Sequence, residues 1–185
     1  MEMTFRSFRL LATVAVAWFC LALPAQAQDL TVFAGGLLPG SVKTSDLPTS
    51  LDNSPIYGVR VSNGFAAWLK LEYTFAFSND LLFPSGASDV TGARGVIVNA
   101  NLLVNIPVGR IVPYVTAGVG LISQFGSNNL PVGTKFAGNY GGGVKLQKLA
   151  GPIGIRIDGR GYTATKVFSR ALNMFELSGG LLISF

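Results

Sequence analysis

The chain contains no histidine, and its single cysteine, Cys20, lies near the N-terminus. Histidine is the usual general base beside a nucleophilic serine, so its absence excludes serine-hydrolase chemistry of that type. A lone cysteine also excludes an intrachain disulfide and a cysteine cluster for a metal ion. Only 12% of the residues are charged, and the basic residues stand singly along the chain. This distribution gives no support to nucleic-acid binding.

Long hydrophobic runs are also scarce, and the one that is present covers residues 10–23. Two arginines precede it, and the small-residue sequence Ala-Gln-Ala follows it at 25–27, a pattern typical of a secretory signal. The run is short against the roughly 20 apolar residues of a membrane-spanning helix, and Pro24 would interrupt such a helix. We therefore expect a cleavable helical signal peptide at residues 1–27 and one exported domain at residues 28–185.

The remainder of the chain is apolar but has no helical span, and its hydrophobic pattern has a period of two. Residues 69–78, Leu-Lys-Leu-Glu-Tyr-Thr-Phe-Ala-Phe-Ser, place the large apolar side chains on one face of a strand and Lys70 and Glu72 on the other. Segments of this kind predict eight strands, at about 30–38, 55–62, 65–78, 94–106, 111–123, 136–146, 153–162 and 173–185.

The predicted connections between these strands alternate between long and short. The long ones are 39–53, 79–93, 124–135 and 163–172. Among the short ones, Asn63-Gly64 suits a two-residue hairpin turn, because both residue types tolerate a positive φ. Outer-membrane barrels carry long extracellular loops and short periplasmic turns. The pattern therefore favours an all-β fold, an eight-stranded antiparallel up-and-down transmembrane β-barrel.

Periodicity alone does not say which face of each strand points inward. A soluble barrel would pack the apolar rows inside, whereas a membrane barrel turns them toward lipid. Glycines 118, 120, 141 and 143 share rows with polar or charged residues, which suits a narrow polar interior. In the membrane arrangement a structural network of charged residues fills the interior, formed by Arg60, Lys70, Glu72, Lys145, Arg156, Asp158, Arg160 and Glu176.

Two further groups of residues bear on function. Aromatic residues near the strand ends are expected to form girdles at the membrane surfaces, namely Phe65, Phe75, Phe77, Tyr114, Phe136 and Phe175. Asp158 and Glu176 could be imagined as paired carboxylates, but with Arg156 and Arg160 as flanking residues we expect structural ion pairs and not a catalytic pair. The glycines of 138–145 lack the Gly-Lys-Ser/Thr ending of a phosphate-binding loop. No cofactor and no metal ion is therefore expected.

Residues 113–120, 141–145 and 155–162, with a last strand that ends in Phe185, resemble the small OmpA/OmpX-like outer-membrane β-barrels of Gram-negative bacteria. The resemblance implies an outer-membrane location, contact with outer-membrane lipid and lipopolysaccharide, and folding by the barrel assembly machinery, for which Phe185 would be the signal. Some outer-membrane barrels are enzymes that rely on a histidine, and since this chain has none, we expect a non-enzymatic protein.

The expected role is therefore structural, or recognition of an extracellular ligand of unknown identity through the loops. Eight strands leave an interior that side chains can fill, so a polar plugged lumen is expected and a general diffusion pore is not. Two alternatives stay open. One is a secreted, soluble, lipocalin-like barrel that binds a small apolar ligand, and the other is an enzyme that acts on envelope lipid.

Overall fold

The computed structural model describes residues 29–39, 42–44, 47–49, 53–79, 94–125, 133–167 and 170–185; the expected signal peptide lies outside them. The strands are β1 (Asp29–Pro39), β2 (Val42–Thr44), β3 (Leu47–Thr49), β4 (Ser54–Gly64), β5 (Leu69–Ser78), β6 (Arg94–Asn105), β7 (Ile111–Phe125), β8 (Thr134–Ala150), β9 (Ile153–Val167) and β10 (Arg170–Ser184). Within these ranges no helix has the length and apolar character needed to cross a membrane.

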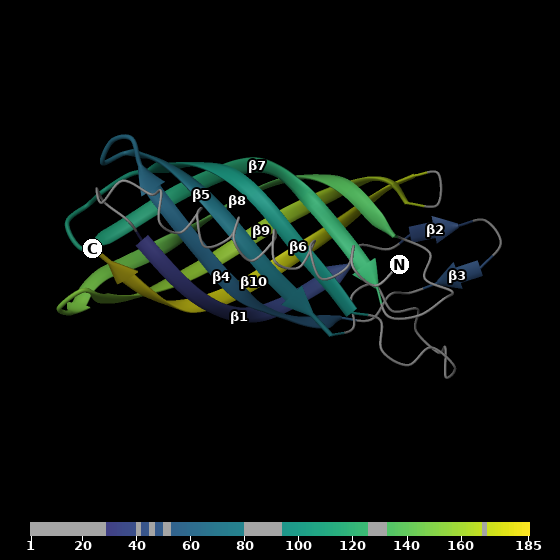
Figure 1. The fold of residues 1–185 in the computed structure, drawn as a ribbon, viewed down its shortest axis with the longest axis horizontal. Coiled ribbons are helices and arrows are strands. Elements are labelled where there is room, and N and C mark those ends of the chain that lie inside the picture. Colours follow the sequence, from purple (N-terminus) through teal and green to yellow (C-terminus); the bar gives the residue numbers. More distant parts are fainter. Residues whose placement is uncertain are drawn as a thin grey trace, which may run out of the picture.

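Eight of the strands form a closed antiparallel barrel in the order β1-β10-β9-β8-β7-β6-β5-β4 (Figure 1). Strands that follow one another in the barrel are paired, and β1 closes it by pairing with both β4 and β10. Each barrel strand therefore has a partner on both sides, and no edge is left open. The prediction of an eight-stranded antiparallel up-and-down β-barrel is confirmed.

The register of the pairs fixes the tilt of the strands. A path that steps from each residue to its paired residue on the next strand leads once around the barrel. It runs through Asp29, Ser62, Glu72, Asn101, Gly118, Asn139, Tyr162, Met174 and Pro39. The path starts at residue 29 of β1 and returns to β1 at residue 39, so the stagger of the barrel is ten residues. A stagger of this size requires strands inclined by roughly 35 to 45° to the barrel axis. The inclination is visible in Figure 1.

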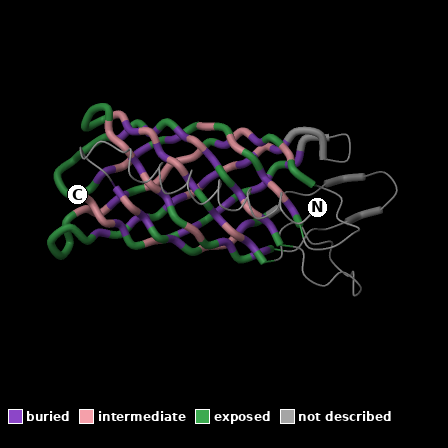
Figure 2. Tube along the Cα trace, viewed as in Figure 1, coloured by how far each residue is buried: buried purple, intermediate pink, exposed green. Residues whose placement is uncertain are grey.

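Burial alternates along every barrel strand (Figure 2). In β5 the large outward-facing ring of Phe75 is 53% exposed, whereas the carboxylate-bearing Glu72 is 0% exposed. The apolar rows therefore face outward and the polar rows inward. A soluble barrel would have the opposite arrangement, so the lipocalin-like alternative does not fit this structure.

The two ends of the barrel differ in their connections. At one end, called the turn end here, lie the connections 65–68, 106–110 and 151–152, together with Asp29 and Ser184 (left in Figure 1). The opposite end is called the loop end. The short hairpin β2–β3 belongs to the loop end and falls within the segment predicted as the loop 39–53.

The predicted hairpin turn at Asn63-Gly64 is wrong. These residues belong to β4, where Asn63 pairs with Leu71, and the chain reverses at residues 65–68. A turn at 63–64 would have placed Tyr57 opposite Lys70, on the same face of the sheet. The observed register instead pairs Ser62 with Glu72, which keeps the polar rows of both strands together inside the barrel.

The predicted loop 163–172 is also wrong. β9 continues to Val167 and β10 begins at Arg170, so only residues 168–169 connect them. Thr163 and Asn173 interrupt the apolar outward rows, so hydrophobic periodicity did not predict that the two strands continue past these residues. In the structure the Thr163 hydroxyl donates a hydrogen bond to the Asn173 side-chain oxygen at 2.9 Å, so the two polar residues satisfy each other across the strand pair.

Candidate functional site

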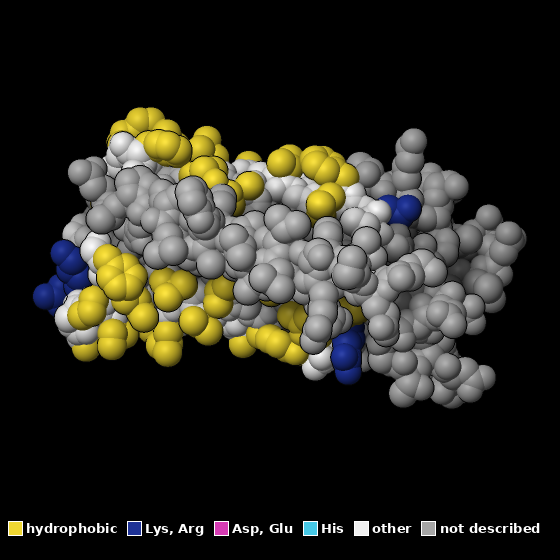
Figure 3. All heavy atoms as spheres, in the orientation of Figure 1, with side chains coloured by type: hydrophobic (Ala, Val, Ile, Leu, Met, Phe, Trp, Pro, Cys, Tyr) yellow, Lys and Arg dark blue, Asp and Glu magenta, His cyan; other side chains and the backbone are white. Residues whose placement is uncertain are grey.

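The outside of the barrel is an apolar belt. Its large, well-exposed members include Val32, Val59, Phe75, Val98, Leu102, Val115, Val119, Ile157, Leu177 and Leu181. Among the described outward-facing residues of the strand interiors, none is charged. The exposed cations Arg94, Arg110 and Lys148 stand at or beyond strand ends, and in Figure 3 the visible Lys and Arg side chains lie near the two ends of the barrel.

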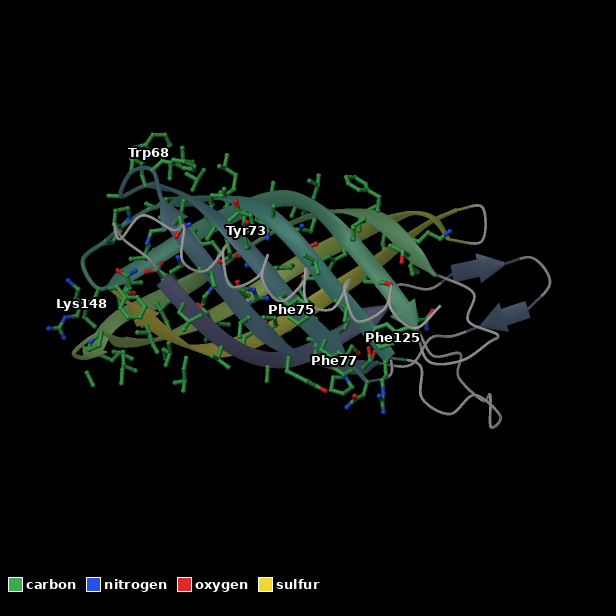
Figure 4. All side chains as sticks on the ribbon, in the orientation of Figure 1. Trp68, Tyr73, Phe75, Phe77, Phe125 and Lys148 are labelled. Carbon is green, nitrogen blue, oxygen red and sulfur yellow. The ribbon has the colours of Figure 1, made fainter. Side chains whose placement is uncertain are left out.

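Aromatic residues occur toward both margins of this belt. Near the loop end the rings of Tyr57 and Phe77 are 5.5 Å apart, and those of Phe77 and Phe125 are 6.4 Å apart. Trp68 extends from the turn end (Figure 4). Phe65 belongs to the same connection, 65–68, and is also exposed. Aromatic side chains at such positions suit the boundary between hydrocarbon and water.

Tyr114 does not belong to a girdle, contrary to the prediction. It is 3% exposed and lies inside the barrel, in the same row of β7 as Thr116 and Gly118. Its hydroxyl donates a hydrogen bond to Asp158 and accepts one from Arg156 Nε at 3.0 Å. The alternation of β7 already contained this information, because the outward row runs through the odd-numbered residues.

The eight charged residues predicted for the interior are all buried there, and six of them form a central cluster: Arg60, Glu72, Arg156, Asp158, Arg160 and Glu176. They come from β4, β5, β9 and β10, and the cluster spans the lumen. Three guanidinium groups face three carboxylates. The cluster is therefore neutral as a unit.

Glu72 holds two of the arginines on separate carboxylate oxygens. Its Oε2 accepts a hydrogen bond from Arg156 at 2.5 Å, and its Oε1 accepts one from Arg160 at 2.6 Å. The Ser62 hydroxyl on the adjacent strand donates to Oε2 at 3.2 Å. All three ionic side chains are fully buried, so each depends on its partners to replace water.

The other two carboxylates complete the cluster. Asp158 pairs with Arg60 at 3.1 Å and with Arg156 at 2.9 Å. Glu176 pairs with Arg60 and accepts a hydrogen bond from the Tyr162 hydroxyl at 2.5 Å. The guanidinium of Arg60 also lies 3.6 Å from the centre of the Phe33 ring, a cation–π contact that β1 contributes.

The remaining two predicted residues form a second group, called the basal cluster, at the turn end. Lys70 and Lys145 both donate to the same oxygen of Asp29, at 2.8 and 2.9 Å. The other oxygen of Asp29 accepts a hydrogen bond from Ser184 at 3.0 Å. Asp29 was not among the predicted residues, because the first strand was predicted to begin one residue later. Asp29 lies on the same face of β1 as Thr31, which points into the barrel, and this alternation could have identified it.

The interior near the loop end is apolar, in contrast to the polar lumen that was predicted. The buried side chains there come from all eight barrel strands, and the layer comprises Leu37, Ile56, Ala76, Ile97, Ile122, Ala137, Ala164, Leu172 and Met174, in contact with Phe33 and Tyr162. From the turn end to the loop end, the lumen therefore contains a small ionic cluster, a neutral ionic cluster and an apolar layer.

Glycines make the narrow interior possible on the β6–β7 wall. A Cβ atom at Gly118 would lie 2.0 Å from the Asn101 side-chain oxygen and 2.3 Å from a backbone oxygen. One at Gly120 would lie 2.1 Å from both the Asn99 side-chain oxygen and a backbone oxygen. The asparagine amides thus occupy the space that side chains at these glycines would need, and this part of the lumen is filled.

The chemistry available inside is limited. Glu72, Asp158 and Glu176 are each engaged by arginine, and Asp29 is engaged by two lysines. The described ranges contain no group of three or more His, Cys, Asp or Glu residues that could hold a metal ion. The arrangement is suited to cross-linking the barrel wall from inside.

A closed eight-stranded barrel with an apolar outside and an ionic inside has the architecture of the small outer-membrane β-barrels. No protein-family model matches the chain, and no curated protein matches it either. Several solved structures do match it in fold.

Neisserial surface protein A superposes with a TM-score of 0.67 at 15% sequence identity, over 86% of this chain and 99% of that one. The N-terminal β-barrel domain of Pseudomonas aeruginosa OprF gives a TM-score of 0.56 at 14% identity, over 85% and 97% of the two chains. The outer membrane enzyme PagL gives 0.51 at 15% identity, over 84% and 98%. At these identities the likeness is one of fold, and it includes both a surface protein and an enzyme.

Proposed function

We propose that this chain is an integral outer-membrane protein with a non-enzymatic role, either structural or in recognition at the cell surface. The observation that carries the proposal is the direction of the side chains. The apolar belt faces outward, and the ion pairs face inward. Such a surface is stable in hydrocarbon and would aggregate in water, since large exposed apolar patches mark contact with a membrane or another protein.

The same proposal places the turn end in the periplasm and the loop end outside the cell. Residues 1–27 would direct export across the inner membrane and be removed, leaving residues 28–185 as the barrel domain. Phe185, at the end of the last strand, would serve as the signal for the barrel assembly machinery. Lipid and lipopolysaccharide would surround the belt. A recognition role would fall to the loops, through a ligand whose identity we leave open.

General diffusion through the barrel is not part of the proposed function. The central cluster and the apolar layer both lie across the lumen, and the apolar layer receives side chains from every barrel strand. Ions that crossed would have to displace buried ion pairs and then enter an apolar region. In planar bilayers we expect no large, stable channels under conditions in which a trimeric porin conducts.

The enzyme alternative receives little support from the interior. The fold is shared with an outer membrane enzyme, but this sequence has no histidine, and Asp158 and Glu176 are held in ion pairs. Incubation of the folded protein with lipid A is expected to leave the lipid intact. Turnover that disappears in Asp158→Asn, while the variant still folds, would overturn the non-enzymatic assignment.

Cell fractionation with gel electrophoresis tests the location directly. The full chain should appear in the outer-membrane fraction, and unheated detergent samples should migrate differently from boiled ones, because a closed barrel resists detergent until heated. Ile157→Arg, which places a charge in the middle of the belt, should reduce the folded, membrane-associated form. Protein that stays in aqueous solution without detergent would contradict the proposal.

A further inference from the structure

The basal cluster contains one positive charge more than it can neutralise. Lys70 and Lys145 share a single carboxylate, that of Asp29, and no other described carboxylate pairs with either lysine. The central cluster is balanced, with three arginines and three carboxylates. The excess positive charge of the interior is therefore located at the turn end.

These ammonium groups also retain hydrogen-bonding capacity. Each has three N–H donors. Among the described residues, Lys70 and Lys145 each donate one hydrogen bond, in both cases to the same oxygen of Asp29. Lys145 Nζ also lies 5.4 Å from the centre of the Tyr114 ring. Lys145 is fully buried and Lys70 nearly so, so bulk water does not freely solvate them.

A second observation comes from Asn105, at the end of β6. Its side chain is 4% exposed, and neither its amide nitrogen nor its amide oxygen has a hydrogen-bond partner among the described residues. Leu103, two residues before Asn105 on the same face of β6, pairs with Lys70. Asn105 itself pairs with Tyr114, whose ring centre lies 5.4 Å from Lys145 Nζ. A buried amide donor is thus present in the same region of the lumen as the two lysines.

We propose that the turn end of the lumen binds a small anion, of the size of chloride, between Lys70, Lys145 and Asn105. The anion accepts hydrogen bonds from the two ammonium groups and the amide, and its charge balances the cluster. A monatomic ion suits the place because the surrounding side chains are buried. Under the proposed orientation, the ion enters from the periplasmic side.

The test is the dependence of folding on chloride at constant ionic strength. The folded protein in lipid vesicles is unfolded with urea, with sodium gluconate replaced stepwise by sodium chloride. An ion that binds only the folded state raises the folding equilibrium constant almost tenfold for each tenfold rise in concentration above its dissociation constant. The urea midpoint should therefore rise with chloride.

Two variants should change the chloride dependence in opposite directions. Lys145→Met leaves one lysine with one carboxylate and should abolish the chloride dependence. Asp29→Asn increases the uncompensated charge, so the anion should bind more tightly and the urea midpoint should begin to rise at lower chloride concentrations. The matched control is Lys148→Met, three residues along the same strand but exposed, which should respond as the unmodified protein does.

Two results would overturn the proposal: urea midpoints that do not respond to chloride in the unmodified protein or in Asp29→Asn, or a dependence that survives in Lys145→Met. If Lys145→Met does not fold, Lys70→Met takes its place. Crystals grown with bromide provide a direct readout, since an anomalous peak beside Lys145 Nζ is expected and its absence counts against the site.

Discussion

Replacement of Glu72 by glutamine should destabilise the barrel strongly. The carboxylate binds Arg156 and Arg160 on separate oxygens, and all three side chains are fully buried. Glutamine keeps the shape but removes the charge, which leaves three buried arginines facing two carboxylates. Removing one partner of a buried ion pair costs about 3 to 5 kcal/mol. This corresponds to an unfolding equilibrium constant raised by about a hundredfold to a few thousandfold.

Reversible urea unfolding from lipid vesicles measures this cost. In the chain without residues 1–27, Trp68 is the single tryptophan and lies at the exposed turn end, so its fluorescence reports on membrane insertion. Lys148→Gln, an exposed change outside both clusters, is the control and should cost less than about 0.5 kcal/mol. The double variant Glu72→Gln/Arg160→Gln should cost less than the sum of its single variants. A cost for Glu72→Gln below about 1 kcal/mol, or strict additivity, would refute the cross-linking role of the central cluster.

Three further predictions use the same unfolding assay. Gly118→Ala should destabilise the folded barrel by about 1 to 3 kcal/mol through overpacking. Gly36→Ala is the control, because a Cβ there meets nothing within 4 Å, and equal effects of the two changes would contradict the packing of the β6–β7 wall. Ile157→Arg should cost about 2 to 4 kcal/mol in bilayers because it carries charge into hydrocarbon, and a neutral result would argue against a lipid-facing belt. Tyr114→Phe should cost about 1 to 3 kcal/mol of stability, because it removes a buried hydroxyl with two hydrogen-bond partners. Tyr140→Phe on the outside should be close to neutral, and a larger cost for Tyr140→Phe than for Tyr114→Phe would contradict the position of Tyr114 inside the barrel.

The alternation of side chains made most of the barrel predictable. In residues 69–78 the alternating residues all lie on the faces predicted for a membrane barrel, and the same reasoning correctly placed Arg60 and Arg156 inside. The period of a strand is a local property, so it can be read from a single segment. The tight turn after β4 was mislocated because a favourable Asn-Gly pair is also only a local signal. The register that matches polar rows across two strands prevailed over it.

Which residues meet inside the lumen could not be read in the same way. The arginine partners of Glu72 are 84 and 88 residues away, and Asp29 pairs with Lys145, which is 116 residues away. Such contacts depend on the stagger of the whole barrel, which is fixed only when β1 and β10 pair. The apolar layer at the loop end was missed for another reason. Residues such as Ile97 and Ile122 are apolar on the inward rows, and a buried interior accepts them as readily as it accepts paired charges.

The positions of the central-cluster charges along the chain have a consequence for how the barrel assembles. Arg60 and Glu72 are carried by β4 and β5, but their counter-charges are supplied by β9 and β10, the last strands to be synthesised. A sheet that stopped after β8 would hold Arg60 and Glu72 without any of the ion pairs that they form in the closed barrel. The ion pairs of the central cluster thus form only when the C-terminal strands arrive, so the same step that closes the barrel also gives the buried charges their partners. Barrels interrupted before that point should be poor insertion products, and the cell would have a physical basis for discarding them.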